Sequence, residues 1–298
     1  MITITNVRAV MTAPEGIDLV IVVVETSEPG LVGYGCATFT QRASAVVDVV
    51  DRYLAPLLAG RDVSRIEDLW RLMHANAYWR GGPVTNNATG GVDMALWDIA
   101  GKRAGMPVYQ LLGGACRDRV DVYRHADGSS IPELIGNARS LVEEGHRYVR
   151  CQIGGYGAAG AMTKDANAES STESSSPGQG GSGAASAGAP GVAAGGAMTP
   201  HPGPQPEPDD RVAIDPARYM ALTIEALQEA RRALGPRIEL LHDVHERVPV
   251  GELARYARKL DDVGLFFLED AVPPDQYEWL RNIRAASVTP IALGELFT

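Results

Sequence analysis

The stretch "IELLHDVHERV" (residues 238–248) joins a short apolar run to two histidines, two carboxylates and an arginine. Two later apolar runs also end in a carboxylate, "LFFLE" (265–269) and "IALGE" (291–295). The three acidic residues Asp243, Glu269 and Glu295 are separated by two successive intervals of 26 residues, about the length of one strand–helix repeat. This rhythm predicts a parallel α/β barrel, in which chemistry collects at the carboxyl ends of the strands.

The same alternation extends back to residue 116. Two further strands are predicted in "RVDVYRHADG" and "RYVRCQIGG", and helices are predicted at 132–144, 219–234, 252–260 and 277–286. Eight strands close a barrel of this type, and only five are predicted here. We therefore expect a TIM-type barrel that is truncated after its fifth strand.

A different organisation is predicted for residues 1–115. Segments rich in β-branched residues, "MITITNVRAVMT" and "DLVIVVVETSE", precede the turn-forming "EPGLVGYG" and predict a small antiparallel sheet. Helical spacing follows at 43–58, at 64–78 and in "GGVDMALWDIAGKRAG". We expect an α+β domain at 1–115 and the partial barrel at 116–298.

The barrel region contains a segment of different composition. Residues 157–210 are rich in Gly, Ala, Ser and Pro and contain no aromatic residue, Leu or Ile. Such a segment buries too little apolar surface to offset its ordering entropy. We expect a disordered low-complexity insertion, with an ordinary linker between domains as the alternative.

Charge and composition narrow the class of partner. The 298 residues carry a formal charge of −10, which argues against a nucleic-acid or anionic-membrane surface and leaves a small molecule as the expected partner. The three cysteines are widely spaced, and no secretory signal or long apolar run is present. These features predict a cytoplasmic protein.

The three strand-end carboxylates predict a metal site. Asp243, Glu269 and Glu295 would repel one another at a single rim unless a cation lay between them. Ligation by oxygen alone favours Mg²⁺. The alternative is that acidic residues cap the following helices, as expected for Asp270, and equal spacing of all three ligands speaks against it.

The two histidines of "HDVH" receive different predictions. His245 lies two residues beyond Asp243, so the two side chains would share a face of a strand, and an imidazole there could act as a general acid or base. His242 has the opposite parity and is predicted to be a hydrogen-bonded structural residue. A zinc site is the weaker interpretation because the available partners are carboxylates.

These residues carry a family resemblance. The motifs "YWRGGPVTNNATGGVDMALWDI", "DVYRHADG", "HDVHERV", "LFFLEDAVPPDQYEWLRNIR" and "TPIALGELF" resemble the D-mannonate dehydratase family, including its starvation-sensing relatives. That family belongs to the mandelate racemase and muconate lactonizing enzyme branch of the enolase superfamily. The resemblance implies an α+β capping domain on a modified (β/α)7β barrel, and homo-oligomers.

The resemblance also implies a reaction. A member would bind Mg²⁺ and a sugar acid, remove the proton α to the carboxylate and expel the β-hydroxyl as water. D-mannonate or D-gluconate would yield 2-keto-3-deoxy-gluconate. The alternatives are a non-catalytic or regulatory relative that binds a sugar acid, and a racemase or epimerase of the same superfamily.

Site roles follow from the same resemblance. Asp243, Glu269 and Glu295 would be the metal ligands, and the catalytic residues would be His245, Arg150 and Tyr156. An arginine lowers the pKa of a nearby tyrosine and so favours phenolate as the base. Tyr156 follows Arg150 by six residues, a shorter interval than in the family. His125 and Thr40 would contact substrate, and Thr40 replaces the asparagine common in the family.

Overall fold

Three strands form an antiparallel sheet near the amino terminus of the computed structural model, which describes residues 1–154 and 215–297. They are β1 (Ile4–Thr12), β2 (Leu19–Thr26) and β3 (Val32–Cys36), in the order β1-β2-β3. β2 is the central strand, and its valines at 20, 22 and 24 are fully buried. The predicted small antiparallel sheet is confirmed.

Helices follow this sheet where helical spacing predicted them. They are α1 (Ala43–Val49), α2 (Ala55–Leu58), α3 (Ile66–Ala75), α4 (Pro83–Ala104) and α5 (Val108–Leu111), with a π-helical turn at Val50–Leu54 between α1 and α2. α4 has Pro83 in its first turn, and its C-cap is Gly105, which has a left-handed φ of 66°. Both residues are typical of the helix ends at which they occur.

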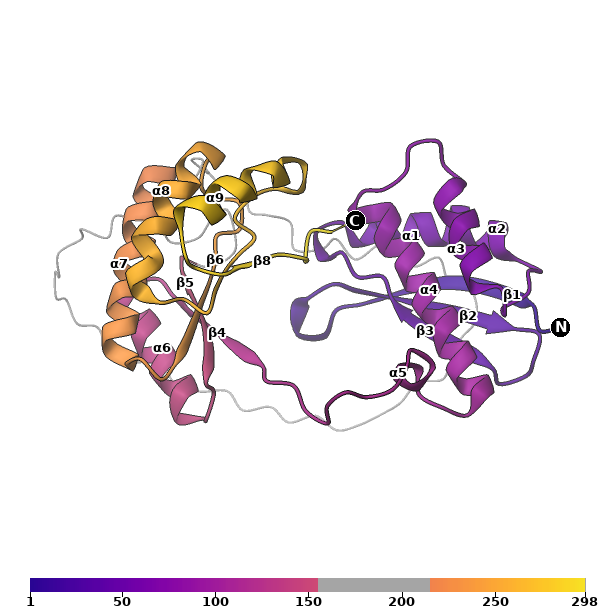
Figure 1. Cartoon of the computed structure of the whole chain (residues 1–298). Helices are drawn as coiled ribbons and strands as arrows, with labels where there is room; N and C mark the ends of the chain where they lie inside the picture. Colours follow the sequence, from indigo (N-terminus) through magenta and orange to yellow (C-terminus); the bar gives the residue numbers. More distant parts are fainter. Residues whose placement is uncertain (155–214, 298) are drawn as a thin grey trace, which may run out of the picture. The chain divides into compact units, whose positions relative to one another are not determined.

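α4 packs very closely on the sheet (Figure 1). A Cβ placed on Gly35 of β3 would lie 1.9 Å from the carbonyl oxygen of Gly91, and one placed on Gly33 would lie 2.1 Å from that of Ala95. Glycine on both elements thus permits backbone contact. The buried apolar residues of α4 and of β1–β3 form one hydrophobic core around this contact.

The second sheet contains five parallel strands. They are β4 (Tyr123–Gly128), β5 (Tyr148–Ile153), β6 (Glu239–Asp243), β7 (Phe267–Glu269) and β8 (Ile291–Ala292), in the order β4-β5-β6-β7-β8. Every neighbouring pair is parallel. The predicted series of βα repeats with five strands is therefore confirmed.

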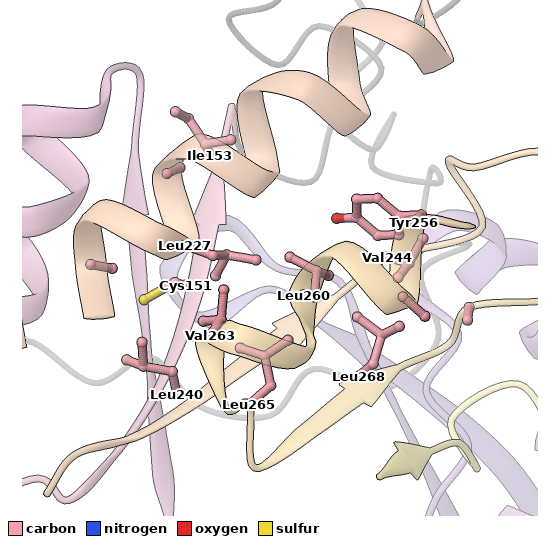
Figure 2. Packing of buried hydrophobic residues seen from close by; sticks show 14 of the residues in the cluster. Cys151, Ile153, Leu227, Leu240, Val244, Tyr256, Leu260, Val263, Leu265 and Leu268 are labelled. Carbon is pink, nitrogen blue, oxygen red and sulfur yellow. The ribbon is translucent and has the colours of Figure 1, made fainter. Parts of the chain in front are cut away.

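Within the described residues, the α-helices that accompany these strands are α6 (Ile131–Glu143), α7 (Pro216–Leu234), α8 (Val250–Leu260) and α9 (Leu280–Ala286). Figure 1 shows them along one side of β4–β8. Figure 2 shows the core between the two layers, with Cys151 and Leu240 from the strands facing Leu227 of α7 and Leu260 of α8. Strand residues of one parity thus contact the helices, which leaves the other parity for the opposite face.

The chain divides into two compact units, one of Met1–Val120 with Leu296–Thr298 and one of Asp121–Glu295. The segment for which we predicted a disordered insertion, residues 157–210, lies outside the described residues. Among the helices of residues 1–154 and 215–297, none combines the length and apolarity needed to span a bilayer.

Candidate metal and acid/base site

Polar residues gather on the face of β4–β8 that does not contact the helices. Arg150 and Gln152 of β5 alternate with Val149 and Cys151, which belong to the helix-facing core. On β6 the same alternation gives Asp243 to the polar face. Arg150, Gln152 and Asp243 are each at most 5% exposed, so the interactions among them form in a region of reduced dielectric.

Arg150 connects the ends of two neighbouring strands. Its Nη1 lies 2.8 Å from Oε2 of Glu269, and its Nη2 lies 3.5 Å from Oδ2 of Asp243. Asp243 and Glu269 are register partners on β6 and β7. The guanidinium therefore offsets the repulsion between two carboxylates that the parallel register places side by side.

Three acidic side chains lie close together at the carboxyl ends of β7 and β8. Glu269, Asp270 and Glu295 each offer an oxygen, and these oxygens lie within 4.8 Å of one another. Asp243 lies outside this group of three but shares Arg150 with Glu269. The predicted ligands are thus brought to one edge of the sheet, and their oxygen-only donors fit a hard cation such as Mg²⁺.

Asp270 belongs to this acidic group, although its sequence position predicted a helix cap. We expected it to cap the following helix, but the cap position of that helical segment, Pro274–Trp279, is Pro273. A left-handed φ of 38° at Asp270 ends the strand alternation, and the side chain joins Glu269 and Glu295. Burial, and then the neighbouring carboxylates, raise the pKa of Asp270 to about 6. The adjacent "ED" pair is the signal that could have identified it.

His245 lies beside Asp243 for a reason other than strand parity. β6 ends at Asp243, and His245 and Glu246 form a turn with left-handed φ values of 53° and 58°. The turn folds back, so that the amide of His245 donates to Oδ1 of Asp243 at 2.8 Å and Nδ1 lies 3.2 Å from Oδ2. The expected pairing is present, although a turn produces it.

This pairing shifts both pKa values. The hydrogen bond to Asp243 raises the pKa of His245, against the opposing effect of burial. Burial acts to raise the pKa of Asp243, but His245 and Arg150 outweigh it and leave that pKa below the usual 3.8. The pair therefore favours an imidazolium against a carboxylate, an arrangement suited to proton donation.

His242 and His125 differ in environment. His242 is 1% exposed and hydrogen-bonded on the helix-facing side, as expected for a structural residue, and burial lowers its pKa to about 4. His125 of β4 is the register partner of Arg150 and stacks on Tyr123 with 5.6 Å between ring centroids. Burial and then the charge of Arg150 lower the pKa of His125. A neutral ring there could exchange hydrogen bonds with a hydroxylated ligand.

Two predicted site residues are not placed among these groups. Tyr156 lies outside the described residues. Thr40 belongs to the amino-terminal unit, where it opens a short 3-10 helix and donates to the side chain of Gln41 at 2.9 Å.

Comparison with known proteins gives two family matches. Residues 3–113 match the model for the mandelate racemase/muconate lactonizing enzyme N-terminal domain. Residues 203–298 match the model for the enolase C-terminal domain-like family. Together the two matches span more than half of the chain.

Curated relatives align along almost the whole chain. The D-galactonate dehydratase family member RspA of Pantoea ananatis is 46% identical over 294 residues, and a D-galactonate dehydratase family member of Musicola paradisiaca is 45% identical. Each alignment covers 99% of this chain and 65% of the relative. The chain thus spans slightly less than two thirds of the length of these relatives.

A solved structure is also similar to this chain along its whole length. The crystal structure of an enolase from Pantoea ananatis with bound D-gluconate and Mg has a TM-score of 0.79 and 43% sequence identity to this chain. The alignment covers 100% of this chain and 66% of the other.

Proposed function

The chain belongs to the mandelate racemase and muconate lactonizing enzyme branch of the enolase superfamily, and from this premise we propose that it is a Mg²⁺-dependent dehydratase of sugar acids. One observation carries the proposal: acidic side chains gather at the carboxyl edge of a parallel sheet. Glu269 and Glu295 lie close together with Asp270. Arg150 joins Glu269 to Asp243, which pairs with His245. The solved relative that holds D-gluconate and Mg supports the same chemistry.

Asp243, Glu269 and Glu295 would hold the cation, with Asp270 next to them. When bound, Mg²⁺ would offset the negative charge that develops on the substrate carboxylate as its α-proton leaves. Arg150 offsets part of the acidic charge at the same edge. The carboxylates can therefore lie close together before any ligand arrives.

His245 would donate a proton to the departing β-hydroxyl. Its hydrogen bond to Asp243 orients the ring and raises its pKa, both of which favour a general acid. Tyr156, activated by Arg150, would remove the α-proton, and His125 and Thr40 would bind substrate hydroxyls. Loss of the α-proton and of water leaves an enol, which converts to the 2-keto-3-deoxy acid.

For the substrate we propose D-mannonate or D-gluconate, and for the assembly a homo-oligomer. The motifs point to the D-mannonate dehydratase family, whereas the curated relatives carry the name of the D-galactonate dehydratase family. D-galactonate therefore belongs in any substrate test. Light scattering after size exclusion tests the assembly.

The deciding experiment incubates the purified chain and Mg²⁺ with D-mannonate, D-gluconate and D-galactonate and measures 2-keto-3-deoxy acid. We expect turnover that falls at least about 100-fold in His245→Asn, the scale of a lost general acid. His146→Asn is the matched control, because His146 lies just before β5, at the amino end of the strands.

The remaining outcomes separate the alternatives. Calorimetric binding of a sugar acid without turnover would favour a non-catalytic relative. Deuterium exchange at Cα without loss of water would favour a racemase or epimerase. The proposal would be overturned if none of the three acids were bound and none were turned over.

A further inference from the structure

A buried hydrogen-bond chain lies behind Asp243, on the helix-facing side of β6. Nδ1 of His242 lies 3.0 Å from the carbonyl oxygen of Cys151, and Nε2 lies 3.1 Å from the hydroxyl of Tyr219. Because a carbonyl only accepts, Nδ1 carries the proton, and Nε2 of the neutral ring accepts from Tyr219. β5 and α7 thus hold the residue that precedes Asp243 from two sides.

Gln152 holds Asp243 from the opposite face. In the amide orientation that satisfies both of its polar atoms, Nε2 donates to the carbonyl oxygen of Asp243 at 3.1 Å, and Oε1 accepts from Arg247 Nη1 at 3.1 Å. Gln152 and Tyr219 are both 0% exposed, so water cannot replace either interaction without opening the core. The carbonyl oxygens of Asp243 and Val244 also lie 3.5 and 3.4 Å from the hydroxyl oxygen of Tyr219.

The backbone held in this way continues into the left-handed turn at His245 and Glu246. The amide of Val244 donates to the carbonyl of Glu269 at 3.0 Å, and that of Glu246 donates to the carbonyl of Asp270 at 3.1 Å. Non-glycine residues with positive φ persist only where their surroundings hold them. The turn that orients His245 therefore depends on support from neighbouring elements.

We propose that Tyr219 and Gln152 are positioning residues that fix the carboxylate of Asp243 and the turn carrying His245. The inference rests on the proposed function, in which Asp243 binds the metal and His245 transfers a proton. Neither positioning residue touches the reacting groups. Partners that orient a metal ligand from behind typically contribute about 10- to 100-fold to metal affinity or activity.

Hydrogen exchange tests the positioning in the bare protein. In Tyr219→Phe we expect the amides of Val244 and Glu246 to exchange about tenfold faster, because a buried hydrogen bond supporting the turn is lost. Tyr148→Phe is the matched control. Tyr148 is half-buried and begins β5 at the amino end of the sheet, where its register partner on β6 is Glu239 rather than Asp243.

Gln152→Met is the second variant, and it keeps the test decisive should Tyr219→Phe unfold. Faster exchange confined to the turn in these two variants supports the inference. Unchanged exchange in both variants, or an equal increase in Tyr148→Phe, overturns it.

Metal titration tests the consequence at the ligand. We expect Mn²⁺ affinity, followed by electron paramagnetic resonance, to fall about 10- to 100-fold in Tyr219→Phe and to stay unchanged in Tyr148→Phe. Unchanged affinity in Tyr219→Phe would overturn the inference. A wild-type chain that binds neither Mn²⁺ nor Mg²⁺ would instead contradict the proposed function, while exchange at the turn would still decide whether Tyr219 and Gln152 hold it.

Discussion

Arg150 dominates the electrostatics of the site at the scale of single residues. The residue is 5% exposed, and its guanidinium contacts carboxylates on two strands, Asp243 and Glu269. Removing one partner of a buried ion pair leaves the other charge without compensation. We therefore expect Arg150→Met to lower the free energy of unfolding by about 3 to 5 kcal/mol at pH 7, measured by urea denaturation.

Arg147 provides the matched control for this prediction. It pairs with Glu239 at 3.2 Å, but its side chain is 65% exposed. Exposed ion pairs contribute about 0 to 1 kcal/mol, so Arg147→Met should change stability little. Saturating Mg²⁺ should restore part of the loss in Arg150→Met, because a cation among the carboxylates supplies the missing charge. Equal losses of unfolding free energy in Arg150→Met and Arg147→Met would contradict the conclusion that the buried ion pairs of Arg150 stabilise the fold.

The sequence predicted this site in part, and the limits are visible in particular residues. The spacing of the strand-end carboxylates predicted that Glu269 and Glu295 lie at one edge of the sheet, because the carboxyl ends of parallel strands lie together, and the structure places them there. The alternation rule paired Asp243 with His245 for the wrong reason, because the strand ends before His245. The left-handed φ of Asp270 turns its side chain toward Glu269, and strand alternation does not predict that φ, so the "ED" pair was not interpreted as two members of one cluster.

Packing of α4 on β3 decides stability at the scale of elements. Gly91 faces the sheet, where a Cβ would lie 2.6 Å from Cβ of Ala37 and 2.9 Å from Cγ2 of Val22. Gly90 faces open space, with no atom within 4 Å of an added Cβ. Alanine substitutions at these two neighbouring glycines are therefore expected to change stability in opposite directions.

We expect Gly91→Ala to destabilise the protein by about 1 to 3 kcal/mol through overpacking. Gly90→Ala should stabilise it by about 0.5 to 1 kcal/mol, because alanine is the better helix former. Thermal and urea unfolding of both variants measure the difference. A shift of the same sign in both would show that Gly91 is not packed against Val22 and Ala37.

Hydrogen bonds to Asp261 connect the end of α8 to the segment before β8. Asp261 accepts hydrogen bonds from Ser287 Oγ at 2.5 Å, Thr289 Oγ1 at 3.1 Å and the amide of Val288 at 3.2 Å. Burial acts to raise the pKa of Asp261, but these hydrogen bonds outweigh it and hold that pKa below the usual 3.8. Ionised Asp261 thus joins the end of α8 to the segment before β8.

A depressed pKa fixes the sign of the pH effect. The stabilisation from Asp261 is fully present above its unfolded pKa and is lost as pH falls through the folded pKa. Asp261→Asn should cost about 1 kcal/mol at pH 7 and should flatten the decline of unfolding free energy between about pH 4 and pH 2. Asp262→Asn, which alters the adjacent exposed residue, should leave the decline as in wild type.

Across the whole molecule, periodicity predicted the order of elements. Alternation and helical spacing identified the antiparallel sheet, the five parallel strands and the helices between them. Details set by local backbone geometry were not predicted. The helix expected at 277–286 begins as a 3-10 segment, Pro274–Trp279, in which Gln276 leaves helical geometry with a φ of −129°. Such details depend on tertiary contacts that a sequence pattern does not encode.

Metal binding should stabilise the protein as a whole through linkage. A ligand that binds only the folded chain raises the free energy of unfolding by about 2.7 kcal/mol at 100 times its dissociation constant. If Asp243, Glu269 and Glu295 hold Mg²⁺, saturating Mg²⁺ should raise the melting temperature of the wild type. The rise should shrink in Glu295→Gln, which removes one charged oxygen donor from the cluster, and persist in Glu225→Gln, which alters an exposed carboxylate of α7. Equal rises in the three proteins would place the cation elsewhere, because only a site that includes Glu295 couples its loss to the stability gained from Mg²⁺.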